Sequence, residues 1–337
     1  MRQAYRRKNS KSSVLVTVLL LAVIGAGFLG IRLYEQRQEA ERAALYVDEP
    51  YQSNRIELNY EGVDYRLRDD LDTYLFLGID KFTEDLPQES YYRNFQQCDF
   101  LFLMIVDHSN QSYSALHINR DTMTEIRQLG LNGQTVGTET AQLALSHTYG
   151  SGGKDSCRNT VWSVSRLLYD VPIDHYVSIT MDGVAVLNDT VGGVVVHISD
   201  DFSSIDPAME MGKDVRLAGN QALTFVRSRM AVGDGSNVSR MRRQREYINA
   251  LYRQIDERMR ADQRFGYRLA SALSDYVISD LTTDEMSKAA ENLRDYRFTT
   301  IYSIEGEVSY DNTFVEFYPD EAALARQVIQ LFFEKMS

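Results

Sequence analysis

Near its N-terminus the chain carries a long stretch without a charged residue, and this stretch restricts the possible architectures most. It runs from Val14 to Ile31 with the sequence VLVTVLLLAVIGAGFLGI. As an α-helix it would span roughly 27 Å, close to the hydrocarbon thickness of a bilayer. A cleavable signal peptide has a shorter apolar region and a small-residue cleavage site, and AGFLG offers no convincing one. We therefore predict an uncleaved transmembrane helix over residues 12–34.

Charge is distributed unevenly on the two sides of this stretch. The part of the chain before Glu35 holds six basic residues and no acid, whereas the part from Glu35 onwards has 30 Lys and Arg against 48 Asp and Glu, a net charge near −18. By the positive-inside rule, residues 1–11 form a cytoplasmic basic tail, and the chain is a single-pass protein of the cell membrane. We expect residues 35–65 to be a stalk or linker and residues 66–337 to form one extracellular domain. Such an acidic domain is a poor general binder of nucleic acid.

Apolar segments of strand length alternate with amphipathic segments of helix length in this domain. Strands are predicted at residues 74–79, 100–107, 113–118, 175–180, 194–198 and 297–303. Helices are predicted at residues 140–148, 159–169, 181–188, 218–226, 238–259, 268–276, 285–294 and 320–335. This alternation indicates a three-layer α/β domain, because helices that follow strands cover the faces of the sheet.

A local excess of arginine stands out in this acidic domain. Five arginines and one acid fall between residues 227 and 243, namely Arg227, Arg229, Arg240, Arg242 and Arg243. On the predicted helix, Arg240, Arg243 and Gln244 lie three and four residues apart and therefore share one face. Two guanidinium groups and an amide provide donors suited to phosphate oxygens. The alternative is a solvated arginine face paired with nearby glutamates.

Other polar residues flank the first three predicted strands. Asp80 follows the first strand, Asp99 precedes the second, and Arg120 and Asp121 follow the third. Ligand sites of α/β sheets lie outside the carboxyl ends of strands. Two carboxylates close together would raise each other's pKa, and a divalent cation between them would relieve the repulsion. Mg²⁺ is the natural candidate, because it takes oxygen ligands and keeps waters beside phosphates. Caps or turn residues are the alternative for each aspartate.

The chain has two cysteines, Cys98 and Cys157, and five scattered histidines. This composition excludes a four-cysteine zinc site, and no histidine pair has the HExxH spacing of a zinc hydrolase. Outside the membrane the two cysteines would meet oxidising conditions. A bridge would close a loop of about 60 residues and contribute roughly 4 kcal/mol. We expect a disulfide, with two unrelated buried thiols as the alternative.

Several motifs occur in an order typical of one family. In chain order they are YLFLGID, QCDFLFLMIVD, INRDTMTEI, AQLALSHTYGSGG with VSRLLYDVPIDHYVSI, and LAGNQALTFVRSR with SNVSRMRRQREYI. They resemble an opening strand with its aspartate, an R-x-D-T strand, an I-P-R-D-T element, a helix–glycine–helix–strand unit, and a closing R-x-R and D-x-x-R-x-x-R-Q signature. Over roughly residues 70–255 the chain therefore resembles the LytR-CpsA-Psr family of bacterial cell-wall enzymes. The resemblance implies a central mixed β-sheet flanked by helices.

The resemblance also implies a reaction. Family members move a glycopolymer, such as teichoic acid, capsule or a related wall glycan, from a polyprenyl-pyrophosphate carrier to a muramic acid hydroxyl of peptidoglycan. A phosphodiester forms and polyprenyl phosphate leaves. Carried over by motif, the metal ligands for Mg²⁺ would be Asp80 and Asp99. The catalytic residues would be Arg120, Asp121, Arg227, Arg229 and Arg240. The pyrophosphate would be bound by Arg120, Arg227, Arg229, Arg240, Arg243 and Gln244.

This chain departs from the family pattern at three positions. Gln97 stands where the family usually has the arginine of R-x-D, so that contact is either lost or supplied by Arg93. Asn119 replaces the usual proline, and Asn237 replaces the first aspartate of the closing signature. These departures leave the other arginines of the family pattern in place.

Two other functions stay open at this point. The same site would serve a pyrophosphatase that acts on polyprenyl-linked lipids with water as the acceptor. A non-catalytic surface module that binds anionic polymer or regulates the envelope is the alternative from another class. Replacement of Arg120 or Asp99 separates these classes, because an enzyme loses turnover whereas a binding module loses only affinity.

Overall fold

The computed structural model describes residues 57–81, 94, 96–131, 133–262, 264–293, 295–310 and 314–336. The predicted basic tail, the predicted transmembrane helix over residues 12–34 and most of the predicted stalk lie outside the described residues. Within the described part of the chain, no helix combines the length and the apolar character that a membrane crossing needs.

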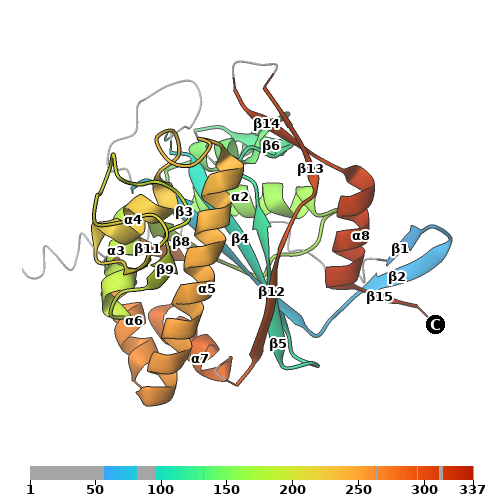
Figure 1. The fold of residues 1–337 in the computed structure, drawn as a ribbon. Coiled ribbons are helices and arrows are strands. Elements are labelled where there is room, and N and C mark those ends of the chain that lie inside the picture. Colours follow the sequence, from blue (N-terminus) through green and yellow to red (C-terminus); the bar gives the residue numbers. More distant parts are fainter. Residues whose placement is uncertain are drawn as a thin grey trace, which may run out of the picture. The chain divides into compact units, whose positions relative to one another are not determined.

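A six-stranded mixed sheet forms the centre of the domain (Figure 1). Its strand order is β11-β8-β3-β4-β5-β12. Strands β3 and β8 are parallel, as are β5 and β12, while the other neighbours are antiparallel. The bounds are β3 Leu71–Ile79, β4 Cys98–Asp107, β5 Ser112–Ile118, β8 His175–Thr180, β11 Val277–Ser279 and β12 Arg297–Ser303. The predicted mixed sheet is confirmed.

The helices follow the predicted amphipathic segments closely. They are α2 Lys154–Leu167, α3 Met181–Thr190, α4 Asn220–Arg227, α5 Asn237–Ala261, α6 Phe265–Leu273, α7 Thr283–Asn292 and α8 Glu321–Phe332. Side-chain caps start several of them: Thr180 accepts a hydrogen bond from Gly183 at α3, and Ser236 accepts one from Ser239 at α5. Such caps satisfy backbone donors that have no partner inside the helix.

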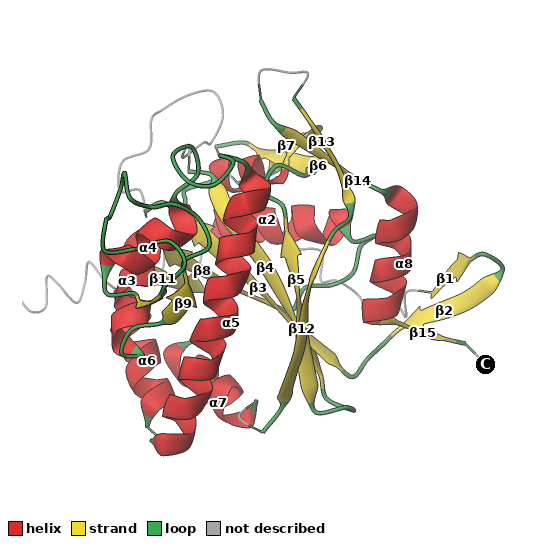
Figure 2. Cartoon of the chain, viewed as in Figure 1, coloured by secondary structure: helices red, strands yellow, loops and turns green. Residues whose placement is uncertain are grey.

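Helices cover both faces of the sheet (Figure 2). On one face, Leu75 and Leu77 of β3 pack with Val164 of α2 and Val328 of α8 in the main core cluster. On the other, Tyr113 of β5 meets Tyr252 of α5, with ring centroids 5.9 Å apart. Residues alternate between the faces of a strand, so each strand contributes to both layers. The three-layer arrangement is confirmed.

A second apolar cluster lies among α4, α5, α6 and the hairpin of β9 (Val195–His197) and β10 (Asp214–Arg216). Phe202 and Phe225 are fully buried there and stack with ring centroids 5.7 Å apart. This cluster fixes α4 against α5, and these two helices carry most of the arginines discussed above.

The structure corrects the start of the helix predicted over residues 140–148. Strand β7 (Thr135–Gln142) pairs with β6 (Met123–Leu129), and the helical part is a 3₁₀ helix, η1 (Leu143–Thr148). Cross-strand partners satisfy the backbone of the threonine-rich segment, and β-branched residues favour strands. The prediction over 320–335 also ends too late, because residues Phe333–Lys335 form β15.

The folded domain begins earlier than predicted. Strands β1 (Glu57–Tyr60) and β2 (Val63–Leu67) form a hairpin, and β2 also pairs with β15. Glu61 and Gly62 make the turn with φ of 52° and 78°, the left-handed conformations that a tight hairpin requires. Residues 57–65 therefore belong to the domain rather than to a linker. A last hairpin, β13 (Gly306–Ser309) and β14 (Glu316–Pro319), lies beside β6 (Figure 1).

The predicted disulfide is absent. Cys98 and Cys157 are both buried free thiols. The Cys98 thiol donates to the carbonyl oxygen of Phe100 at 3.0 Å, and Cys157 Sγ lies 3.8 Å from His147 Nε2. Each thiol thus has a partner of its own in the core, and burial raises the pKa of Cys98 to about 12.

Candidate anion-binding site

Sheet register brings the predicted carboxylates to one edge. Strand β3 ends at Ile79, which pairs with Cys98 at the start of antiparallel β4. Asp80 directly follows Ile79, and Asp99 directly follows Cys98. The pairing of Ile79 with Cys98 therefore brings the two aspartates into the same region. Strand β5 ends opposite the beginning of β4, where Ile118 pairs with Leu101. The polar segment that follows β5 consequently lies beside Asp99.

A pocket of about 310 Å³ opens at this edge. Its lining is Asp80, Lys81, Asn94, Gln96, Gln97, Asp99, Met181 and Arg227. Three of the predicted site residues (Asp80, Asp99 and Arg227) thus share one cavity. Sequence reasoning missed Lys81, although its position directly after Asp80 at the end of a predicted strand was the available signal.

Arg120 is held at the pocket by its neighbours. Its guanidinium donates to the Asp99 carboxylate and to the Gln97 side-chain oxygen, and Arg120 Nε lies 3.3 Å from Asp121 Oδ1. Burial lowers the pKa of Arg120, and the nearby charge of Arg229 also lowers it, while Asp121 acts in the opposite direction. Gln97 therefore accepts a hydrogen bond from Arg120, and an arginine at position 97 would place a second cation against it.

Arg240 has a donor that no protein group satisfies. Its side chain is buried near the N-terminus of α5, and Arg240 Nε donates to Asn237 Oδ1 at 3.0 Å. Among the described residues, buried Arg240 Nη2 has no hydrogen-bond partner. Burial lowers the pKa of Arg240 to about 10, and the neighbouring charges of Arg120 and Arg229 contribute to the shift. Three guanidinium groups crowded in this way favour binding of an anion.

Arg227 and Arg229 flank the end of α4. Arg227 Nη2 lies 3.9 Å from Asp80 Oδ1, and its side chain is more than half exposed. Arg229 Nε donates to the carbonyl oxygen of Gly235 at 3.2 Å. Arg227 thus lines the pocket. Arg229 adds a third positive charge close to those of Arg120 and Arg240.

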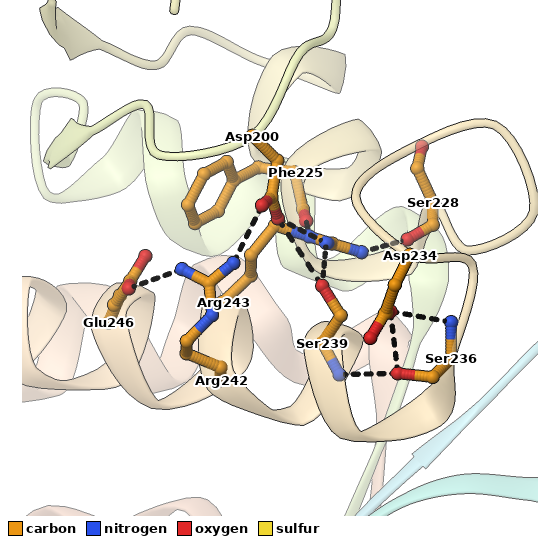
Figure 3. A network of polar contacts seen from close by, with 9 residues as sticks. All are labelled: Asp200, Phe225, Ser228, Asp234, Ser236, Ser239, Arg242, Arg243 and Glu246. Carbon is orange, nitrogen blue, oxygen red and sulfur yellow. Dashed lines mark hydrogen bonds and ion pairs between the residues drawn. The ribbon is translucent and has the colours of Figure 1, made fainter. Parts of the chain in front are cut away.

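Two predicted pyrophosphate ligands are engaged elsewhere. The Arg243 side chain is only 1% exposed, and its guanidinium is bonded to Asp200, to Ser239 and to carbonyl oxygens at the C-terminal end of α4 (Figure 3). Gln244 Nε2 donates to the carbonyl oxygen of Val226 at 3.2 Å. Arg243 is therefore not available as a pyrophosphate ligand, because its guanidinium is buried and its donors are bonded to other groups. Arg93 lies outside the described residues.

Two departures from the family pattern are in direct contact. Asn237 Nδ2 donates to Asn119 Oδ1 at 2.6 Å, and the same oxygen accepts the backbone N–H of Asp121 at 3.0 Å. Asn237 Oδ1 in turn accepts from Arg240. The pair connects the segment after β5 to the first turn of α5. It therefore sets the relative positions of Arg120 and Arg240.

We predict that Asn119 and Asn237 act as a unit. A double-mutant cycle with Asn119→Ala and Asn237→Ala is expected to give a coupling free energy of about 0.5–2 kcal/mol, because the two amides share a buried hydrogen bond. Urea unfolding of the wild type, both single variants and the double variant measures it. Additive losses would show that the contact contributes no stability of its own.

The donor chemistry of the pocket fits Mg²⁺. Asp80 and Asp99 offer carboxylate oxygens on the wall of one cavity. In the described part of the chain, no group of three or more His, Cys, Asp or Glu side chains forms a complete cage. Mg²⁺ usually takes one or two carboxylates and completes its shell with waters and phosphate oxygens. These residues therefore fit Mg²⁺ better than a metal that needs several protein ligands.

Sequence reasoning also missed His117, which lies beneath the arginines. Its ring is buried on β5 between Phe100 and Phe102, with centroids 5.3 and 6.0 Å away. Its Nδ1 has no partner among the described residues. Burial lowers the pKa of His117 to about 3, and the charges of Arg245 and Arg240 contribute. The signal in the sequence was a histidine one residue before the end of a buried strand.

This histidine predicts a pH dependence of stability. The pKa of a histidine in the unfolded chain is about 6.5, whereas the pKa of His117 in the folded protein is about 3. The free energy of unfolding should therefore fall as the pH drops from about 6.5 towards 3, by up to about 1.4 kcal/mol per pH unit. His117→Phe should pack against the two phenylalanines and make this dependence less steep; the rest of it comes from buried His147, whose pKa burial lowers to about 4. Urea unfolding between pH 7.5 and 4.5 tests it, and equal slopes in both proteins would contradict it.

A mixed α/β domain with clustered arginines and two carboxylates at one sheet edge has the donor chemistry expected of proteins that bind phosphate-like anions. The sequence matches the LytR_cpsA_psr family over residues 34–331, and the chain belongs to this family.

Three relatives illustrate the match. The chain is 33% identical over 196 residues to the polyisoprenyl-teichoic acid–peptidoglycan teichoic acid transferase TagU of Halalkalibacterium halodurans, covering 58% of this chain and 59% of that protein. It is 27% identical to TagU of Enterococcus faecalis, covering 83% and 81%. The crystal structure of TagV from B. subtilis superimposes with a TM-score of 0.58 at 23% identity, covering 79% of this chain and 97% of that one.

Proposed function

We propose that the protein transfers a glycopolymer from a polyprenyl-pyrophosphate carrier to peptidoglycan. Relatives named teichoic acid transferases support this proposal, and teichoic acid is the first donor polymer to test. The observation that carries it is the buried, unpartnered Nη2 of Arg240 among the charges of Arg120 and Arg229. A pyrophosphate supplies several anionic oxygens that match this excess of donors.

In the proposed reaction the acceptor hydroxyl oxygen bonds to the phosphorus that carries the glycan. The bond between this phosphorus and the bridging oxygen breaks, and polyprenyl phosphate leaves with the electron pair. The proton of the acceptor hydroxyl passes to the leaving phosphate or to solvent. Arg120 and Arg240 would bind the pyrophosphate oxygens, and Arg227 and Arg229 would stabilise charge on the leaving group. Such positioning and charge stabilisation dominate phosphoryl transfer.

Asp121 is best suited to orient Arg120. Its side chain is 3% exposed, and Oδ1 lies 3.3 Å from Arg120 Nε. Its backbone carbonyl also accepts from the N–H of Phe317 at 2.8 Å, which anchors the segment to β14. We propose that Asp80 and Asp99 hold Mg²⁺, which when bound would supply positive charge at the pyrophosphate oxygens. Asp99 would do this while remaining beside Arg120.

Half-buried apolar side chains beside the pocket support a place for the lipid. On β3 and β4, Phe76, Phe100 and Met104 are partly exposed on the face opposite to the main core, and Phe102 is buried among them. Gly78 has no side chain to displace Phe100, whose Cβ would lie only 2.8 Å from an added Cβ. We propose that the first isoprene units contact this face.

We also propose that residues 12–34 anchor the protein in the cell membrane as a single pass, with the domain outside. The uncharged run between Val14 and Ile31 and the basic residues before it support this topology. Cell fractionation of the full-length protein tests it. Recovery in the soluble fraction would contradict the proposal.

Turnover by the full-length protein in detergent tests the proposed activity. The assay combines a short polyprenyl-pyrophosphate glycan, Mg²⁺ and a peptidoglycan acceptor, with Arg120→Ala as the inactive control. Acceptor-dependent release of polyprenyl phosphate, lost in the variant, would establish the transferase. Release without acceptor would favour a pyrophosphatase. Tight binding of several glycans without turnover would favour a non-catalytic module.

A further inference from the structure

A buried polar network connects the C-terminal end of α4 to the first turns of α5 (Figure 3). At its centre is Asp200, in the loop between β9 and β10. Asp200 Oδ2 accepts from Arg243 Nη1 at 2.6 Å, and Asp200 Oδ1 accepts from Arg242 Nη2 at 2.7 Å. The Asp200 side chain is 10% exposed and that of Arg243 1%. A guanidinium this deeply buried needs such a counter-charge.

Arg243 closes the C-terminal end of α4. Its Nε donates to the carbonyl oxygen of Phe225 at 3.2 Å, and its Nη2 donates to that of Ser228. The last carbonyls of a helix have no partner inside the helix, and a cation there also complements the helix dipole. Ser228 stands between Arg227 and Arg229, so Arg243 holds the peptide group between Ser228 and Arg229, in the short segment that carries the two proposed pyrophosphate ligands.

The same network holds the far end of this segment. Ser239 Oγ accepts from Arg243 Nη1 at 3.1 Å, and Ser239 N–H donates to the Ser236 cap of α5. Gly233, with a φ of +64°, lies directly against the network. A Cβ added at this position would lie 2.6 Å from Ser239 Oγ and 3.3 Å from Asp200 Cγ. Both ends of the segment over residues 227–236 are therefore attached to one buried ion pair.

We infer that Asp200 and Arg243 are positioning residues for substrate binding, because their buried ion pair fixes the Ser228 carbonyl and thereby directs Arg227 and Arg229 towards the anion. This inference rests on the proposed function. Asp200 also neutralises Arg243, so the fifth arginine of the cluster adds no free charge that would draw the pyrophosphate away from Arg240.

Two variants and two matched controls test the inference on the full-length protein in detergent. Asp200→Asn removes the counter-charge, and Arg243→Lys keeps the charge but cannot reach both carbonyl oxygens. The control Asp201→Asn makes the same change at an exposed neighbour. The control Arg242→Lys makes the same change at a residue that contacts Asp200 but no α4 carbonyl.

Calorimetric titration with inorganic pyrophosphate gives the dissociation constant and the stoichiometry separately. If the pair positions the arginines, Asp200→Asn and Arg243→Lys should raise the dissociation constant roughly tenfold to a hundredfold, because small displacements of binding groups cost that much. Both controls should stay within about twofold of wild type. Hydrogen exchange should also accelerate in residues 226–236 of the two variants.

Other results would overturn the inference. A purely structural pair would lower only the stoichiometry, as part of the protein unfolds while the folded part binds with wild-type affinity. Wild-type affinity in both variants would likewise refute the positioning role and leave the proposed function intact. If wild-type protein itself does not bind pyrophosphate, the proposed function fails and the inference fails with it.

Discussion

Arg240→Met is expected to lower turnover by about 100- to 1,000-fold, the usual loss when a charge-stabilising donor is removed from an active site. Arg240 is the guanidinium with a buried Nη2 that no described group satisfies. Its loss should leave the fold intact, because a buried cation beside Arg120 and Arg229 opposes folding. The free energy of unfolding should therefore be retained or rise. Steady-state release of polyprenyl phosphate and urea unfolding measure the two effects.

Arg253→Met is the matched control for this prediction. Arg253 lies on the same helix but lines a separate pocket together with His197 and Glu257. It should keep wild-type turnover. If Arg240→Met retained turnover within threefold of wild type, the anion site would have to lie elsewhere on the domain.

Asp99→Asn is expected to reduce turnover at least about 100-fold. The Asp99 carboxylate is paired with Arg120 and lines the pocket with Asp80. The variant therefore loses the counter-charge that directs Arg120 and one of the two carboxylates proposed for Mg²⁺. Removing one partner of a well-formed charge pair near the reacting groups costs several kcal/mol of interaction. Turnover measured over a range of Mg²⁺ concentrations should show both a lower maximum and a higher requirement for the ion.

Two comparisons separate the parts of this effect. Asp80→Asn should raise the Mg²⁺ requirement without an equal loss at saturation, because Asp80 lies 3.9 Å from exposed Arg227 and does not orient Arg120. Asp182→Asn makes the same charge change at an exposed residue of α3 next to Met181 of the pocket, and should have little effect. An Mg²⁺ response of Asp99→Asn identical to wild type would contradict a metal role for Asp99.

Much of the fold follows from local sequence patterns. The strands predicted at residues 175–180 and 297–303 coincide with β8 and β12, and the long helix predicted over 238–259 falls within α5. Where prediction was wrong, local signals were weak. Strand β7 carries a polar, threonine-rich sequence, and its backbone is satisfied only through pairing with β6. The β1–β2 hairpin is positioned by the pairing of β2 with β15, which comes from the opposite end of the described chain.

The site shows the same division. Sequence motifs identified Asp80, Asp99, Arg120, Arg227, Arg229 and Arg240, and the sheet register brings the first three to one edge. Helical spacing alone also placed Arg243 on the ligand face. In the structure Arg243 serves the fold instead, because α4 ends against this part of α5 and the carbonyl oxygens of Phe225 and Ser228 accept its donors.

Composition, charge distribution and motif order by themselves determined the alternation of strands and helices, the family resemblance and the arginine-rich chemistry. These properties are local, because they depend on residue type and on spacing along the chain. Only the tertiary structure decided which arginines gather at the proposed anion site and which serve the fold. That choice depends on partners far apart in sequence, such as Asp200 for Arg243 and Asn119 for Asn237, which meet only when the sheet edge and α5 pack together.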